Sequence, residues 1–194
     1  MRPKLLAAAL AGILAVILYV IPPVGPAPTA ADRMPLTNLE VPPASIHMLD
    51  PTPVRLVIAS IGVDARIESR GLDTSRNLAS PTDIRDVAWY NLGPRPGEHG
   101  NALLNGHVNW WTGDAVFTHL SRIKVGDQVR VVRADGVTVV FKVTARRTVD
   151  AHARIASLFE AGTTSTLTLI TCSGVWNPLT QSDTQRLLVS ASIA

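Results

Sequence analysis

The sequence predicts a mostly β domain, either a barrel or a sandwich, built from seven or eight short strands. Three observations indicate this fold class. Apolar residues alternate with other residues over 137–143, β-branched runs are separated by turn residues at regular spacing, and helical periodicity is sparse. With 194 residues, the chain is long enough for one such domain and an N-terminal appendage.

The N-terminal appendage is expected to be a membrane anchor followed by a linker. A basic start precedes residues 5–21, a run without charge that would span roughly 26 Å as a helix, near the lower limit for crossing a bilayer. We therefore predict an uncleaved anchor over residues 1–21, with the remainder outside the cytoplasm. A cleaved signal is the alternative, because residues 29–31 are small. The proline-rich residues 22–53 predict an extended linker.

The globular domain is predicted to span residues 54–194 and to open with strands. The first two strands flank a turn at Gly62, and a loop of turn residues covers 91–97. The fourth strand ends at Gly106 and His107. These four predicted strands cover residues 54–58, 63–67, 83–90 and 102–107.

The second half of the domain is predicted to contain a short helix, a hairpin and two closing strands. Residues 114–121 are typical of a helix with Asp114 near its N-cap. The turn at 134–136 separates two strands of a hairpin. Residues 153–161 are either a short helix or a loop. The hairpin and closing strands cover residues 129–133, 137–143, 166–172 and 186–193.

The lone cysteine, Cys172, is expected where its strand ends, because Ser173 and Gly174 favour a turn. If the strand alternates its faces, Leu167 and Leu169 point to the core and Cys172 points to the other side. In the last strand, Arg186 stands on the face opposite the apolar residues Leu187, Val189, Ala191 and Ile193. Cys172 and Arg186 are therefore predicted to project from the same side of the sheet.

Composition excludes several classes of function. A single cysteine excludes an internal disulfide and a zinc site of the CxxC type. The net charge of +3 is small and the basic residues are scattered, which argues against nucleic acid as a partner. A serine hydrolase is disfavoured because the chain contains no GxSxG. A lone cysteine can still be an inert buried side chain, and that reading stands beside a catalytic one.

A cysteine nucleophile needs a partner that exchanges protons, and histidine is the usual choice near neutral pH. Of the five histidines, His107 ends a predicted strand, as Cys172 does. The others fall in the linker, a polar loop, the predicted helix and a position after a strand: His47, His99, His119 and His152. Arg186 is a candidate for stabilising an oxyanion.

Several separated motifs, in this order, resemble the sortase family. They are IGVDARI, WYNLGPRPGEHGNALLNGHVN, AVFTHL, VGDQV, RADG, TLITC and the final RLLV. The similarity covers residues 54–194, and the sequence fits the forms found in actinobacteria, often called class E and class F. The N-terminal anchor and linker also fit the layout of that family.

The resemblance implies a closed eight-stranded β-barrel that acts on the outer surface of Gram-positive cells. Such enzymes cut a C-terminal LPXTG-type sorting signal between threonine and glycine. They hold the protein as a thioester on cysteine and pass it to an amine of a peptidoglycan precursor or a pilin lysine. This chemistry needs no metal and no cofactor, and the expected location is a single-pass membrane protein with its catalytic domain outside.

The resemblance also assigns roles to residues. Cys172 matches the nucleophile, His107 the general acid and base, and Arg186 the group that holds substrate and stabilises the oxyanion. Thr171 matches a position that contacts the sorting signal. Class F members often carry an aromatic residue shortly before the arginine, and residues 182–185 have none. The subclass therefore stays open between E and F.

Three tryptophans and two asparagines complete the candidate site. Trp176, taken as substrate-binding, is predicted with Trp110 and Trp111 to line the groove, and packing is the alternative. Asn105 and Asn109 are candidates for orienting His107.

Two other classes of function fit the same residues. One is a membrane-tethered β-domain that only binds or spaces, and the other is an extracytoplasmic cysteine hydrolase that releases its product to water. Reaction of Cys172 with a thiol reagent, together with an activity assay, separates the first from an enzyme. Product analysis with and without an added amine separates the second from a transpeptidase.

Overall fold

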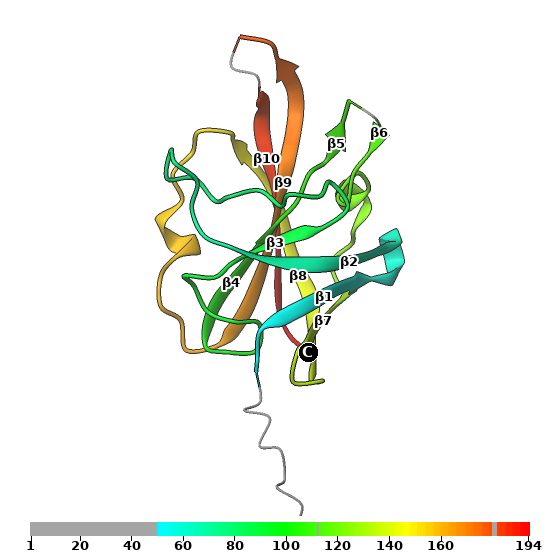
Figure 1. Ribbon diagram of the computed structural model, residues 1–194, viewed down its shortest axis with the longest axis vertical. Coiled ribbons are helices and arrows are strands. Elements are labelled where there is room, and N and C mark those ends of the chain that lie inside the picture. The colour runs from blue at the N-terminus through cyan, green and yellow to red at the C-terminus, as the bar shows by residue number, and fades with distance from the viewer. Residues whose placement is uncertain (1–49, 112, 180–181) are drawn as a thin grey trace, which may run out of the picture. The chain divides into compact units, whose positions relative to one another are not determined.

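A closed barrel is the architecture of the part of the chain that the computed structural model describes, residues 50–111, 113–179 and 182–194. Its strand order is β1-β2-β3-β4-β9-β10-β8-β7 (Figure 1). The barrel strands are β1 (Pro53–Ile58), β2 (Val63–Arg70), β3 (Val87–Tyr90), β4 (Gly100–Asn105), β7 (Gln128–Arg133), β8 (Thr138–Asp150), β9 (Ser165–Asn177) and β10 (Ser182–Ile193). The predicted mostly β, closed eight-stranded barrel is therefore confirmed.

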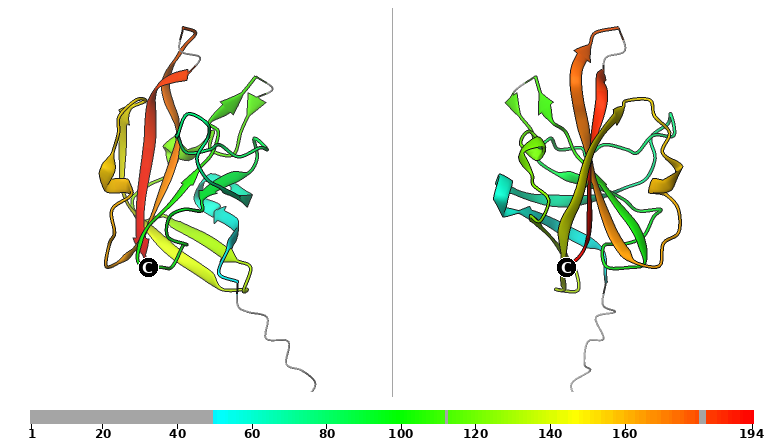
Figure 2. Two further views of the ribbon diagram at one scale, coloured as in Figure 1. Left: turned by 60° about the vertical axis from the view of Figure 1, so that its left-hand side comes forward. Right: turned by 180° about the vertical axis from the view of Figure 1, so that it is seen from behind.

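Smaller elements decorate the barrel. Within the described residues, a two-stranded hairpin consists of β5 (Asn109–Trp110) and β6 (Gly113–Asp114), and three short 3-10 helices are η2 (Ala59–Ile61), η3 (Leu120–Arg122) and η4 (Ala156–Leu158). Figures 1 and 2 show that this hairpin and one end of the β9–β10 pair project from the same end of the barrel.

The predicted anchor over residues 1–21 lies outside the described residues, as does the predicted linker except for its last four residues. Within the described residues, no helix has both the length and the apolar character needed to cross a bilayer.

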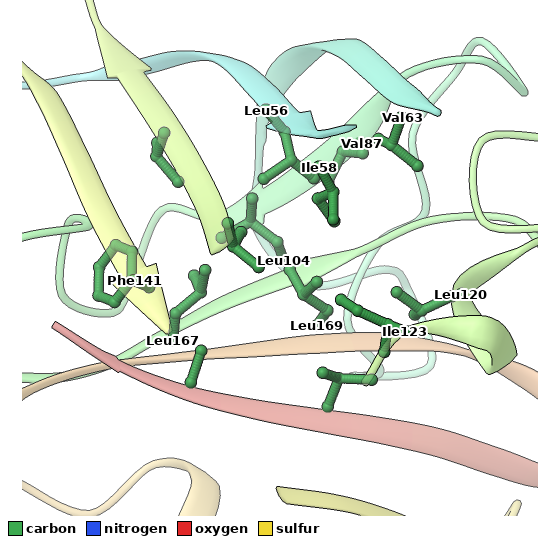
Figure 3. Packing of buried hydrophobic residues seen from close by; sticks show 14 of the residues in the cluster. Leu56, Ile58, Val63, Val87, Leu104, Leu120, Ile123, Phe141, Leu167 and Leu169 are labelled. Carbon is green, nitrogen blue, oxygen red and sulfur yellow. The ribbon is translucent and has the colours of Figure 1, made fainter. Parts of the chain in front are cut away.

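The barrel interior is filled by apolar side chains from all eight strands and from the segment that contains η3 (Figure 3). Leu167 and Leu169 of β9 are fully buried there, as the alternation predicts. Leu187, Val189 and Ala191 of β10 join them. Ile193 was expected on the same face, but it is 52% exposed because it lies at the last position of its strand.

The predicted helix over residues 114–121 is wrong, since β6, a turn and η3 occupy that stretch. The hydroxyl of Thr118 accepts a hydrogen bond from the Ala115 N–H at 2.9 Å and donates one to the Val108 carbonyl at 2.6 Å. Such side-chain bonds to the backbone offer an alternative to helical pairing. The turn still delivers Phe117 and Leu120 to the core.

Several predicted strand limits also differ from the structure. The strand expected over 83–90 starts only at Val87, because Asp83 accepts hydrogen bonds from the Arg85 and Asp86 N–H groups and forms a turn. Val137, expected to begin the alternating face, precedes β8 and is 47% exposed. The last three long strands extend further than the apolar pattern indicates, because their outer portions pair with one another beyond the core.

Candidate active site

Cys172 and Arg186 lie directly opposite each other on the antiparallel strands β9 and β10. Residues that oppose each other in an antiparallel pair project from the same face of the sheet. Their chain neighbours Thr171 and Leu187 also oppose each other, and both are buried on the interior side. The thiol and the guanidinium therefore share the face that points away from the core, as the sequence predicts.

The predicted turn after Cys172 is wrong, because β9 continues through Gly174 to Asn177. The pairing with β10 shifts between Gln185 and Asp183, so Gly174 and Val175 together oppose a single residue, Thr184. Gly174 has a φ of +90°, and a Cβ there would lie 2.5 Å from the Thr184 hydroxyl. A glycine that favours a turn in the sequence thus supplies a β-bulge, and the strand resumes beyond it.

His107 follows the end of β4, beside the stretch of β9 that leads to Cys172. The N–H of Gly106 donates to the Ile170 carbonyl at 3.1 Å, and the Thr171 hydroxyl donates to the Gly106 carbonyl at 2.8 Å. The His107 carbonyl accepts a hydrogen bond from the Phe117 N–H at 2.9 Å. Because β4 and β9 are parallel neighbours, these bonds place the His107 backbone at the same end of the sheet as Cys172.

Gly106 allows this close approach. A Cβ at this position would lie 2.7 Å from Val116 and 2.9 Å from Phe117, distances that side chains do not adopt. The Gly-His pair therefore has a physical basis, since the glycine lets β4 pack against the turn that follows β6.

Thr171 is predicted to contact the sorting signal, and the structure gives its side chain a different neighbour. It is 3% exposed, and its hydroxyl is bound to the Gly106 carbonyl. Thr171 thus ties the strand of Cys172 to the segment of His107 from the interior side. Direct contact with a substrate stays a prediction.

Arg186 is half-buried and its guanidinium is oriented by the start of its own strand. Nη1 donates to the carbonyls of Asp183 at 3.2 Å and Gln185 at 2.9 Å, while Nη2 donates to the Ser182 hydroxyl at 3.0 Å. Guanidinium carries five N–H groups in a planar fork. These bonds fix the plane of the group and leave further N–H groups for a bound substrate.

The environment favours the protonated form of the Cys172 thiol. Burial is the largest influence and raises the pKa of Cys172 above its ordinary value. The positive charge of Arg186 acts in the opposite direction, and the negative charge of Asp183 raises the pKa further. At neutral pH the resting cysteine is therefore a thiol, and a proton must leave it before it attacks.

This arrangement gives a pH-dependent prediction. Asp183→Asn removes a charge that disfavours the thiolate, so the pKa of Cys172 falls and the thiolate forms at lower pH. The measurement is the rate of alkylation by iodoacetamide against pH, whose midpoint moves to lower pH in the variant. Glu160→Gln, a neutralising change in the segment between β8 and β9, is the control and leaves the midpoint in place. An unchanged or higher midpoint for Asp183→Asn contradicts the assigned influence of Asp183.

The tryptophans predicted to line the groove differ in their surroundings. Trp110 is 44% exposed and lies against His107, with ring centroids 5.2 Å apart and an interplanar angle of 64°. Trp111 is 87% exposed at the tip of the same hairpin. Trp176 is 58% exposed on β9 beyond the bulge, next to the stretch of β10 that leads to Arg186.

The two asparagines predicted to orient His107 have other surroundings. The side-chain amide of Asn105 donates to the Ala79 carbonyl at 3.2 Å. Asn109 is exposed at the start of β5, where its backbone pairs with Asp114.

A cavity of about 330 Å³ lies on the outer side of β4, and sequence reasoning missed it. Leu103 and Asn101 of β4 form part of its wall, and the segments that precede β4 and β9 complete it. Tyr90 and Phe159 meet there edge to face, with ring centroids 5.7 Å apart. The two aromatic residues are far apart in the sequence, so no local pattern indicates that they meet. Cys172, His107 and Arg186 are not among the residues that line this cavity.

The described residues contain no group of three or more histidine, cysteine, aspartate or glutamate side chains placed to hold a metal ion.

Comparison with known proteins identifies the family. The family model for the sortase domain matches residues 56–194. Comparison with curated proteins finds no match. Among solved structures, sortase C-1 from Actinomyces oris is 27% identical with a TM-score of 0.58, over 76% of this chain and 78% of that chain.

Two further sortase structures share the fold at lower identity. A lid mutant of sortase A from Corynebacterium diphtheriae is 22% identical with a TM-score of 0.58, over 75% of this chain and 71% of that chain. A lid mutant of sortase C1 from Streptococcus agalactiae is 20% identical with a TM-score of 0.56, over 73% of this chain and 68% of that chain. From the family match and the barrel, this chain belongs to the sortase family of cysteine transpeptidases.

Proposed function

We propose that this sortase cleaves an LPXTG-like C-terminal sorting signal between threonine and glycine and transfers the new carboxyl end to an amine. The observation that carries the proposal is the direct opposition of Cys172 and Arg186 on β9 and β10. It occurs at the end of the barrel where the bond from Thr171 to Gly106 holds the His107 segment. In this proposal Cys172 is the nucleophile, His107 the general acid and base, and Arg186 the donor to the oxyanion.

The proposed reaction has two halves. The Cys172 proton passes to His107 as sulfur bonds to the threonine carbonyl carbon, and Arg186 donates to the resulting oxyanion. The bond from that carbon to the glycine nitrogen then breaks, His107 returns the proton to the leaving amine, and a thioester remains. The acceptor amine attacks the thioester and gives a proton to His107. The carbon–sulfur bond breaks, and the thiol regains its proton.

The cavity beside β4 supports a binding role for the residues that precede the cleaved bond. Leu103 pairs with Thr168, four positions before Cys172 in β9. Four residues of extended chain span roughly 13 Å. An extended signal whose threonine carbonyl lies at Cys172 can therefore place its leucine near the apolar wall formed by Leu103, Tyr90 and Phe159.

We further propose that residues 1–21 hold the enzyme in the cell membrane, with the barrel outside the cytoplasm. The uncharged run over residues 5–21 and its basic flank support this location. Deletion of residues 1–31 should release a soluble chain that keeps its peptide-level activity, because the barrel core is built from residues 56–191. Membrane fractionation and a peptide assay measure both properties. A truncated chain that is folded but inactive contradicts the tethering role.

A peptide panel tests the proposed reaction. The full-length enzyme is incubated with LPXTG-type peptides that vary at single positions, with and without an added amine such as triglycine. We expect cleavage between threonine and glycine and an amide product that contains the added amine. The proposed acceptors, a peptidoglycan precursor or a pilin lysine, are represented by their amines in the same assay. If hydrolysed product alone forms at high amine concentration, the result contradicts the transfer step.

A further inference from the structure

We propose that Trp110 is a positioning residue for His107, which its indole holds in the orientation needed for proton transfer. This inference rests on the proposed role of His107 as general acid and base. The observation that carries it is the edge contact between the imidazole and the indole, with centroids 5.2 Å apart and planes at 64°. Aromatic rings at this separation and angle attract each other beyond the effect of burial alone.

The His107 side chain needs such a support. The hydrogen bonds at Gly106 and at the His107 carbonyl fix the backbone on both sides of the residue. They do not fix the two side-chain torsions that aim the imidazole. In the described parts of the chain, no hydrogen bond joins the His107 ring to another protein group, and the amide of Asn105 is bound to Ala79 instead. The indole is thus the group seen to restrain the ring.

Trp110 is itself held by a braced hairpin. Its backbone pairs with Gly113, whose φ of +124° suits glycine. The base of the hairpin is closed by the Thr118 hydroxyl, which donates to the carbonyl of Val108 and accepts from the N–H of Ala115. Val108 directly precedes β5 and Ala115 directly follows β6, so one hydroxyl fastens both ends of the hairpin. A hairpin braced in this way can hold Trp110, and with it the His107 ring that Trp110 contacts, in a fixed position.

The neighbouring Trp111 provides a matched control. It lies in the same hairpin, it is 87% exposed, and His107 is not its ring partner. If turnover depended on hairpin stability or on general hydrophobicity, replacing either tryptophan would lower it. If turnover depends on the position of the His107 ring, only replacement of Trp110 lowers it.

The test uses the full-length enzyme and the variants Trp110→Leu, Trp110→Phe and Trp111→Leu. Removing an aromatic contact of this kind should lower kcat roughly 3- to 10-fold. We expect that loss for Trp110→Leu with KM nearly unchanged, recovery to within about 2-fold for Trp110→Phe, and an unchanged kcat for Trp111→Leu, in which loss of the predicted groove lining changes only KM. In NMR spectra of ring-labelled histidine, assigned with His107→Ala, the His107 signals move in Trp110→Leu as the indole ring current is lost.

Unchanged kcat and unchanged His107 signals in Trp110→Leu overturn the inference. A change confined to KM also overturns it, because Trp110 would then act as a wall for substrate. Equal losses in Trp110→Phe and Trp110→Leu contradict support by an aromatic ring. His107→Ala separates this inference from the proposed function. If His107→Ala retains turnover, the role of His107 fails; if it is inactive while Trp110→Leu is unaffected, only the positioning role fails.

Discussion

Replacement of Cys172 by alanine is expected to abolish transpeptidation while the barrel stays folded. The thiol is the proposed site of the acyl intermediate, so its loss removes the covalent route and should lower turnover at least about 10³-fold. Cys172 is half-buried and projects away from the core cluster, so truncation leaves no large cavity in the barrel. Peptide cleavage and amide formation, followed by chromatography, measure the loss.

Cys172→Ser sharpens this prediction. A hydroxyl is a weaker nucleophile than a thiol, and nothing at the site is tuned to deprotonate it. The serine variant should therefore be nearly as inactive as the alanine variant, with circular dichroism showing the same β signature as the unchanged chain. Substantial turnover by either folded variant removes the thioester route.

Replacement of Arg186 by alanine has the second largest expected effect, a loss of about 10²–10³ in turnover. Arg186 lies opposite Cys172, and its guanidinium is oriented by Ser182, Asp183 and Gln185. The alanine variant loses the donor to the oxyanion and the charge that favours the Cys172 thiolate. The pKa of Cys172 should therefore rise as turnover falls.

The choice of control for Arg186 depends on the structure. Arg147 is exposed on β8, where it opposes Leu188 of β10, so Arg147→Ala keeps a similar sheet environment and should retain turnover. Arg146 is unsuitable, because it donates to the carbonyls of Ser121 and Ile123 and supports the η3 segment. Arg186→Lys should rescue little, since one ammonium cannot reproduce a planar fork bound at two nitrogens. Near-normal turnover in a folded Arg186→Ala variant contradicts the assignment.

Strand alternation is the part of the site that the sequence predicts well. Leu167 and Leu169 lie on one face of their strand and Cys172 lies on the other. Leu187 and Arg186 are divided between the two faces of the last strand in the same way, which is enough to place the thiol and the guanidinium on one side of the sheet. The same logic identifies the hairpin of β7 and β8, whose inward residues Val139, Phe141 and Val143 are buried. Alternation is a local property, so it can be read without knowing the rest of the fold.

The features that sequence reasoning missed depend on contacts between distant or irregular segments. Gly174 favours a turn by composition, but the pairing with Thr184 turns it into a bulge inside a long strand. The helix expected around Thr118 is replaced by a turn because its hydroxyl binds two backbone groups. The contact of Trp110 with His107 depends on the small β5–β6 hairpin that carries Trp110, and that hairpin is too short to leave a sequence pattern.

Formation of a thioester on Cys172 is the central claim, and intact-mass spectrometry tests it most directly. The full-length enzyme is mixed with an LPXTG-type peptide and quenched in acid. Its intact mass is then measured, and fragmentation locates the modified residue. We expect an added mass equal to the peptide fragment that ends at threonine, located on Cys172, lost on addition of hydroxylamine and absent from Cys172→Ala. Cleavage between threonine and glycine without any adduct on Cys172, or with the adduct on another residue, would contradict the account.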